Sequence, residues 1–92
     1  MINRSYFYRI FKNSTGMSPY EYLNTYRISI ARTLLSETDL SIADIALSTG
    51  FTSFSSFYRF FVQKNGISPR KYRSLCRKDA RYNRQKNNKQ QP

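Results

Sequence analysis

The stretch SSFYRFFVQKNGISPRKY, residues 55–72, decides the fold, because a closely related stretch, SYFYRIFKNSTGMSPYEY, occupies residues 5–22 of the same chain. The two segments align without a gap at an offset of fifty positions, and nine of their eighteen residues are identical. The shared residues include a glycine and a Ser-Pro pair, which are typical of the end of one helix and the start of the next. A repeat of this kind indicates one supersecondary unit that is used twice.

The first copy predicts a helix, a turn and a long second helix. Phe7, Ile10 and Phe11 recur at spacings of three and four, which indicates an amphipathic helix over residues 3–13. Ser18 as N-cap and Pro19 at the first helical position then start a linker helix that extends to about residue 36. Its predicted apolar stripe consists of Tyr22, Leu23, Tyr26, Ile30 and Leu34.

The second copy predicts the same arrangement with an additional helix ahead of it. Residues 41–50 predict a short helix that starts at Ser41, ends at Gly50 and carries an apolar stripe. Thr52 or Ser53 caps a helix that continues to about residue 64, and a last helix extends from Ser68 to about residue 76. The stripe of the short helix comprises Ile42, Ile45, Ala46 and Leu47, and Tyr72 and Leu75 are expected to face the core from the last helix.

These elements predict an all-α domain over residues 1–76, with a partial first unit at 1–17, a linker helix at 18–36 and a complete second unit at 41–76. The expected core residues are Phe7, Ile10, Phe11, Leu34, Phe57, Phe60 and Phe61. Residues 77–92 have only Ala80 and Tyr82 as apolar side chains and no helical periodicity, so we expect a disordered basic tail there.

Composition restricts the partners and excludes several kinds of chemistry. The 92 residues suffice for one small domain, and a net charge of +11 favours a polyanion such as nucleic acid. With no histidine and only Cys76, the chain cannot form an internal disulfide, a Cys/His zinc site or a cysteine nucleophile paired with a base. We therefore expect neither a metal nor a cofactor nor an enzymatic activity.

The same composition argues against a membrane. No apolar run approaches the ~20 residues that span a bilayer, and the start of the chain lacks the apolar core of a signal peptide. A basic peptide on a membrane surface is disfavoured, because Ser18, Pro19 and Gly50 separate packed helices instead of allowing one continuous amphipathic face. A cytoplasmic protein is the expectation.

Spaced residues in both halves resemble the AraC/XylS family of bacterial transcription regulators. The matching positions of the first half are Arg9, Phe11, Lys12, Gly16, Ser18, Tyr22, Arg27, Ala31, Leu34 and Leu35. Those of the second half are Ile42, Ala46, Gly50, Phe51, Phe57, Arg59, Phe61, Gly66, Ser68, Pro69, Tyr72 and Arg73. The resemblance extends from about residue 3 to residue 73.

The resemblance implies two helix-turn-helix units, the first incomplete, joined by a long helix, with recognition helices at 3–13 and 53–64 that enter the major groove of double-stranded DNA. It implies sequence-specific DNA binding and transcription regulation, and RNA polymerase is a further candidate partner. No small-molecule ligand is expected, because the effector-sensing domain of many family members has no counterpart in these residues.

The outward faces of the two recognition helices supply the candidates for reading bases. Arg9 and Arg59 hold equivalent positions, and arginine can make a bidentate contact with a guanine edge. Arg59 could instead pair with Asp44 or with a helix carboxyl end. The complete set of base-reading candidates is Ser5, Tyr8, Arg9, Phe54, Ser55, Ser56 and Arg59.

Several of these candidates also have a structural interpretation. The serines could serve as helix caps, and Tyr8 and Tyr58 could pack on the edge of the core. Phe54 could lie against a thymine methyl group or extend the inward stripe of phenylalanines. The candidates for phosphate contacts, which add salt-dependent affinity, are Arg4, Lys12, Arg70, Lys71 and Arg73.

The repeat also predicts a defect in the first unit. Residues 41–50 precede the second copy, whereas Met1 already aligns with Phe51, so the first copy has no counterpart of that short helix. We expect a truncated domain whose first recognition helix is poorly anchored, since each large apolar side chain left exposed forgoes ~1.5–3 kcal/mol of burial. The alternative function is a degenerate fragment that binds DNA only nonspecifically, or that interferes through RNA polymerase or the intact regulator.

Overall fold

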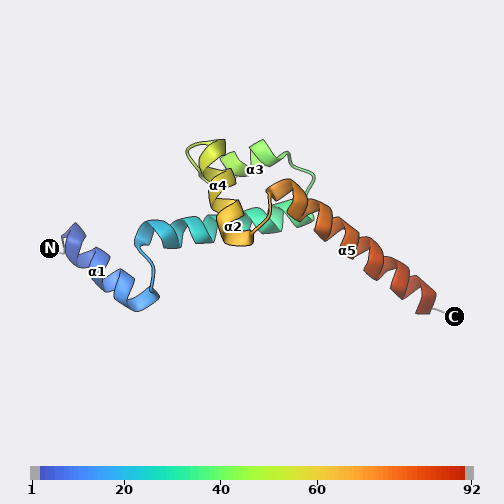
Figure 1. Ribbon diagram of the computed structural model, residues 1–92, viewed down its shortest axis with the longest axis horizontal. Helices are drawn as coiled ribbons and strands as arrows, with labels where there is room; N and C mark the ends of the chain where they lie inside the picture. Colours follow the sequence, from blue (N-terminus) through green and yellow to red (C-terminus); the bar gives the residue numbers. More distant parts are fainter. Residues whose placement is uncertain (1–2, 91–92) are drawn as a thin grey trace.

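The computed structural model describes the backbone of residues 3–90 and the side chains of residues 3–81, and every regular element in this part is a helix. The elements are α1 (Arg4–Thr15), α2 (Pro19–Glu37), α3 (Ile42–Ser48), α4 (Phe54–Asn65) and α5 (Pro69–Gln90). The molecule measures 66 × 27 × 21 Å, because α1 lies at one end of α2, α5 leaves from the other end, and α3 and α4 pack against one side of α2 (Figure 1). The predicted all-α class with two units on a long helix is confirmed.

Each helix begins at a polar side chain that accepts a hydrogen bond from the backbone N–H three residues later, which satisfies one of the donors that a helix start leaves unpaired. Ser53 therefore caps α4, which resolves the choice between Thr52 and Ser53. The five caps are Asn3 to Tyr6 (2.7 Å), Ser18 to Glu21 (3.1 Å), Ser41 to Asp44 (3.0 Å), Ser53 to Ser56 (3.1 Å) and Ser68 to Lys71 (3.1 Å).

The fifty-residue repeat is preserved in three dimensions. Helices α1 and α4 both have 12 residues and begin fifty positions apart. Both end at a glycine with a φ of 77°, in the left-handed region that glycine tolerates best. The ring of Phe11 meets Tyr22 edge-on at 5.3 Å, and the ring of Phe61 meets Tyr72 edge-on at 5.7 Å. The same helix, turn and aromatic contact therefore occur twice.

The hydrophobic core belongs to the second unit. It lies where α2, α3 and α4 meet, and α5 contributes Tyr72 at its edge. The buried apolar residues are Ile28, Ala31, Leu35, Ile45, Ala46, Phe51, Phe57 and Phe61, with Leu34, Ile42, Phe60 and Tyr72 partly buried against them. The predictions of Phe57 and Phe61 as core residues are confirmed, whereas Leu34 and Phe60 lie at its border.

The predicted apolar stripe of α2 is wrong for four of its five members. Tyr22, Leu23, Tyr26 and Ile30 are all exposed, and the face that packs carries Asn24, Ile28, Ala31 and Leu35. Two apolar arcs lie next to each other on this helix, and the arc with Ile28, Ala31 and Leu35 forms one buried core with residues of α3 and α4. Leu47 on α3 and Leu75 on α5 were also expected to face the core, yet they are exposed.

The first unit has no buried residue on its helix α1. Phe7 and Ile10 are exposed and Phe11 is only half-buried, so their prediction as core residues is wrong. The physical reason lies in the repeat: Ile45 and Ala46 of α3 cover Phe57, whereas within residues 3–81 no equivalent helix covers Phe7. The expectation of a weakly packed first helix agrees with this exposure.

Helix α5 continues beyond the predicted limit. The sequence predicts a helix end near residue 76 and a disordered tail over 77–92, but the helix extends to Gln90. Residues 70–91 contain neither proline nor glycine and are rich in Lys, Arg and Gln, which favour helices even without an apolar stripe. Arg77 also holds the extension through an ion pair with Asp39 at 2.6 Å. Residues 91–92 of the predicted tail lie outside the described residues.

Among the residues that the structure describes, no helix combines the length and the apolar character that crossing a membrane requires.

Candidate nucleic-acid interface

The turn between α3 and α4 fixes the position of α4. Gly50 has a φ of 94°, and a Cβ atom at this position would lie 3.2 Å from Nε of Arg27 on α2. The Arg27 guanidinium stacks on the ring of Phe51 at 5.7 Å and donates through Nη1 to Oδ1 of Asn24 at 3.1 Å. A side chain at residue 50 would need the Arg27 guanidinium to shift by a few tenths of an ångström, and the positive φ itself favours glycine.

Two buried phenylalanines orient the faces of α4. Phe57 and Phe61 are both fully buried against α2 and α3. A contact between Arg32 and Asn65 fixes the carboxyl end, since Nη1 of Arg32 donates to Oδ1 of Asn65 at 3.0 Å. The opposite arc of α4, with Ser55, Tyr58 and Arg59, is exposed to solvent.

Arg59 is the cation at the centre of this exposed arc. In the part of the chain that the structure describes, neither Asp44 nor a helix carboxyl end holds its guanidinium, and the ion pair found there joins Arg77 to Asp39. Its donors are therefore available to a partner that approaches the outer face of α4. Arginine in such a position can donate two parallel hydrogen bonds to O6 and N7 of guanine.

Phe54 and Ser56 each had two predicted roles, a contact with DNA or a structural role within the domain. The Phe54 ring lies 6.2 Å from the rings of both Phe57 and Tyr58, yet the residue is 48% exposed, so it extends the core and also presents a free face. The Ser56 hydroxyl is half-buried and lies 3.0 Å from the Ser53 hydroxyl within the cap of α4. Ser56 therefore contributes to the start of the helix, and Ser55 is the serine that faces outward.

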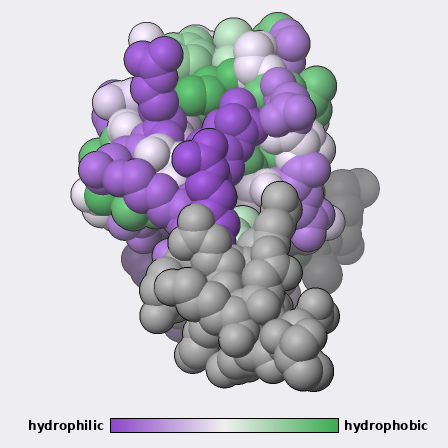
Figure 2. Space-filling model, turned by 90° about the vertical axis from the view of Figure 1, so that its right-hand side faces the viewer, coloured by the Kyte–Doolittle hydropathy of each residue, from purple (hydrophilic) through white to green (hydrophobic). Residues whose placement is uncertain are grey.

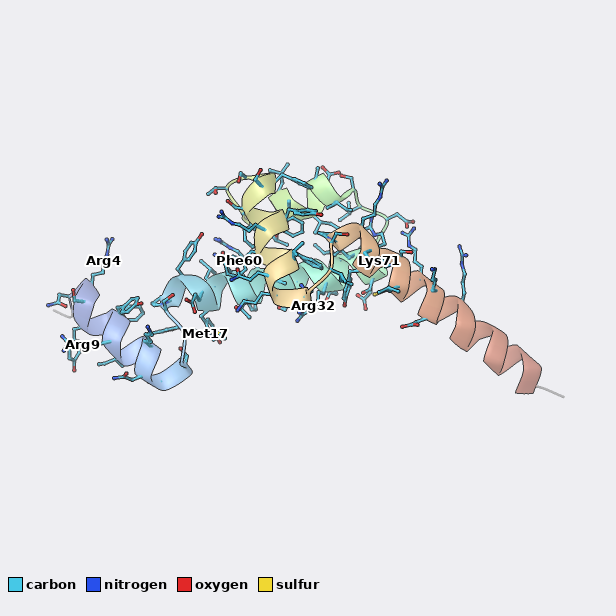
Figure 3. All side chains as sticks on the ribbon, in the orientation of Figure 1. Arg4, Arg9, Met17, Arg32, Phe60 and Lys71 are labelled. Carbon is cyan, nitrogen blue, oxygen red and sulfur yellow. The ribbon has the colours of Figure 1, made fainter. Side chains whose placement is uncertain are left out.

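The candidates of the first unit all project from α1. Ser5, Tyr8 and Arg9 are exposed, as is the predicted phosphate contact Arg4. Figure 3 shows Arg4 and Arg9 extending from α1. The Nζ atom of Lys12 lies 5.9 Å from the ring centroid of Tyr8. The arc of α1 thus has the same order of residue types as that of α4, but it rests on a helix without buried anchors.

The phosphate candidates separate into two groups. Arg70 and Lys71 are exposed at the start of α5. Arg73 instead donates through Nε to the carbonyl oxygen of Leu35 at 3.0 Å and through Nη2 to that of Thr38 at 3.2 Å. Arg73 is thus engaged at the end of α2, and its predicted phosphate contact stays a prediction.

The positioning contacts of α2 were not predicted. Arg32 and Asn65 are 33 residues apart, and no local pattern connects them. Asn24 is buried, and its Nδ2 atom has no hydrogen-bond partner among the described residues. Only the contact between Asn24 and Arg27 has a signal in the sequence, because side chains three residues apart lie on the same helix face.

The Tyr72 hydroxyl is the one described titratable group with a clear shift. Burial raises its pKa above the ordinary value of 10.0, and the neighbouring Cys76 thiol raises it further through its charge and a hydrogen bond, while Arg32 opposes the shift. Tyr72 stays neutral at physiological pH and acts as a packing residue. No group of three or more potential metal ligands occurs among the described residues.

Comparison with known proteins gives concordant results. A family model described as a helix-turn-helix domain matches residues 1–74. The chain is 43% identical over 74 residues to the melibiose operon regulatory protein of Escherichia coli K12, covering 80% of this chain and 24% of that protein. It thus spans about a quarter of the length of this curated relative.

Two solved structures have the same fold. The DNA-binding domain of the global transcriptional factor AdpA, in complex with a target DNA, is 34% identical with a TM-score of 0.80, and the match covers 84% of this chain and 69% of that one. The C-terminal domain of the response regulator yesN from Fusobacterium nucleatum is 31% identical with a TM-score of 0.73, covering 77% and 69%.

Proposed function

The chain belongs to the AraC-type helix-turn-helix family of transcription regulators, and we propose that it binds double-stranded DNA sequence-specifically through α4 and thereby regulates transcription. The similarity to a domain whose structure was solved with its target DNA supports this proposal. The proposal places the protein in the bacterial cytoplasm, where the DNA lies, and assigns it no catalytic activity.

The observation that carries the proposal is the two-sided construction of α4. Phe57 and Phe61 are buried and fix the rotation of the helix about its axis, so that Arg59 lies on the opposite, exposed arc. A helix fits the major groove, and a rigidly held arginine can read a guanine there. Ser55 and Tyr58 flank Arg59 along the groove, and Phe54 offers its free ring face to a thymine methyl group.

The exposed candidates for phosphate contacts serve affinity. Arg70 and Lys71 at the start of α5 and Arg4 and Lys12 on α1 lie where they can neutralise phosphates without reading sequence. Such contacts make binding steeply dependent on salt.

The alternative function is nonspecific DNA binding, with interference through RNA polymerase or an intact regulator. The exposure of Phe7 and Ile10 favours this alternative for the first unit, because α1 lacks the burial that would hold Arg9 in one orientation. The two functions differ in whether the affinity depends on base sequence.

The test is a selection from randomised duplexes, followed by titration of the enriched duplex against random competitor at several salt concentrations. We expect one preferred sequence, and Arg59→Ala should lower the discrimination against a mismatched base by about 1–3 kcal/mol. Arg59→Lys should also lower this discrimination, since lysine keeps the charge but cannot make the bidentate contact. Lys71→Ala is the control, and it should weaken binding to all duplexes equally.

Unchanged discrimination in Arg59→Lys would remove Arg59 from the base-reading role. A selection that enriches no sequence, with the same salt dependence on every duplex, would establish the nonspecific alternative.

A further inference from the structure

Helix α5 carries a basic face that extends beyond the part of the chain that the family shares. The family model ends at residue 74, whereas α5 continues to Gln90. Arg70, Ser74, Lys78 and Arg81 line a shallow hollow along one side of this helix, together with Arg73 and Arg77. Their spacings of three, four and seven residues place them on one face.

Two of these arginines hold the helix in a fixed direction. Arg73 bonds to the carbonyl oxygens of Leu35 and Thr38, and Arg77 pairs with Asp39 at 2.6 Å. All three partners belong to the end of α2 or to the residues directly after it. These contacts tie α5 to the end of α2 as far as Arg77, and from there the helix continues away from the domain (Figure 1).

The other cations of this face have no partner among the described side chains. Arg70, Lys78 and Arg81 are exposed, and the acidic residue on the same stretch, Asp79, lies on another arc of the helix. Figure 2, which looks toward this end of the molecule, shows hydrophilic residues over much of the visible surface. The face is thus an uncompensated positive stripe.

The stripe is continuous with the outer face of α4. Arg70 lines a groove with Phe54 and Tyr58 of α4, so one surface extends from the start of α4 onto α5. From Arg70 to Arg81 the helix rises about 17 Å, at 1.5 Å per residue. This length corresponds to about half a turn of duplex DNA, whose turn rises about 34 Å.

We propose that the stripe Arg70, Lys78 and Arg81, here called the basic arm, binds the phosphate backbone of duplex DNA on one side of the sequence read by α4. This inference rests on the proposed function and adds a second contact surface to it. Arg73 and Arg77 are positioning residues that direct the arm, and the arm adds affinity and salt dependence but no base specificity.

The experiment uses the full chain and the duplex enriched in the selection described above. Kd is measured over a salt series for a duplex limited to the recognised sequence and for two others, each extended by about ten base pairs, one helical turn, on one side. We expect one extension to tighten binding and steepen the salt dependence, and the other to have no effect. Equal gains from both extensions, or none from either, would overturn the oriented arm.

Variants identify the residues responsible. Lys78→Gln combined with Arg81→Gln should lower the salt slope on the favoured long duplex by about 1.8, because each lost phosphate contact accounts for about 0.9. The same variant should leave the short duplex unaffected. Lys64→Gln removes a charge at the carboxyl end of α4 and is the control; an equal loss in this variant would show a general charge effect and refute the arm.

A last variant separates an oriented helix from a flexible basic tail. Ala80→Pro keeps every charge but interrupts α5 within the arm. We expect it to abolish the gain from the favoured extension, with the domain shown to be folded by an unchanged thermal transition. If the extension still tightens binding to this variant, the direction of α5 does not matter and the proposal is refuted. If no sequence is enriched in the selection, the proposed function fails; if one is enriched and its extensions have no effect, the arm alone fails.

Discussion

The guanidinium of Arg73 closes the carboxyl end of α2, where its Nε atom donates to the carbonyl oxygen of Leu35 at 3.0 Å. Its Nη2 atom donates to the carbonyl oxygen of Thr38 at 3.2 Å. The last carbonyl groups of a helix have no partner within the helix and form the negative end of its dipole. The Arg73 guanidinium supplies hydrogen-bond donors to these carbonyl groups and a positive charge at the negative end of the dipole. It thereby connects α5 of the second unit to the linker helix α2.

Replacing Arg73 should therefore destabilise the domain. Arg73→Ala removes two charge-assisted bonds at a half-buried site, and we expect the free energy of unfolding to fall by about 2 kcal/mol. Arg70→Ala is the matched control at an exposed position of the same helix and should change it by less than about 0.5 kcal/mol. Urea unfolding followed by circular dichroism measures both; equal effects would contradict the structural role of Arg73.

The turn at Gly50 should tolerate a methyl group less well than the turn at Gly66. Both glycines have positive φ, which costs a non-glycine residue about 1–2 kcal/mol, but only at Gly50 would the new Cβ meet Arg27, at 3.2 Å. We expect Gly50→Ala to lower the melting temperature more than Gly66→Ala. Adding Arg27→Ala should reduce the difference, and independent effects in this double-mutant cycle would show that the contact is unimportant.

Equivalent phenylalanines of the two units should differ in their contribution to stability. Phe57 is fully buried, so Phe57→Ala should cost about 3–5 kcal/mol, whereas Phe7 is 51% exposed and Phe7→Ala should cost less than about 1 kcal/mol. Thermal unfolding of the two variants measures the contrast. A similar loss at both positions would indicate that α1 is packed in solution in a way that the structure does not show.

Stability should decline at alkaline pH through Tyr72. Because burial, followed by the Cys76 thiol, raises its pKa above 10.0, the folded state retains the proton more strongly than the unfolded state. Its contribution is complete below pH 10 and is lost as pH rises from there through the folded pKa. The difference between wild type and Tyr72→Phe in ultraviolet absorbance titration isolates this group among the eight tyrosines. A transition of that difference below pH 10 would refute the assignment.

The two candidate base readers should contribute unequally. Arg59 lies on a helix with two buried phenylalanines and Arg9 on a helix with none, so only Arg59 is held in one orientation before DNA arrives. We expect Arg59→Ala to weaken binding to the selected duplex more than Arg9→Ala, as measured by fluorescence anisotropy. The reverse order would mean that the first unit carries the specificity.

The boundaries of most elements follow from local sequence signals. A hydroxyl cap, a proline at the first position and a glycine after the last turn predict the starts of α2, α3, α4 and α5 and the ends of α1 and α4, because these signals act within four residues. The end of α5 was missed, since helix propensity and a distant ion pair sustain a segment that has no apolar stripe. The outward positions of Ser55 and Arg59 on α4 were predicted correctly, because the spacing of Phe57 and Phe61 determines the inward face, whereas Ser56 is half-buried in the cap.

The sequence by itself determined that one helix, its turn and the start of the next helix occur twice, with arginines at equivalent positions, since identity at a fixed offset requires no knowledge of contacts. Only the tertiary structure decided which face of α2 is buried, that Arg73 bonds to the end of α2, and that Arg77 of α5 pairs with Asp39. Each of these depends on contacts between different helices or the residues directly after them, and those of Arg73 and Arg77 join residues 35–38 positions apart. Their meeting is set by the packing of whole helices against α2, which no local periodicity encodes.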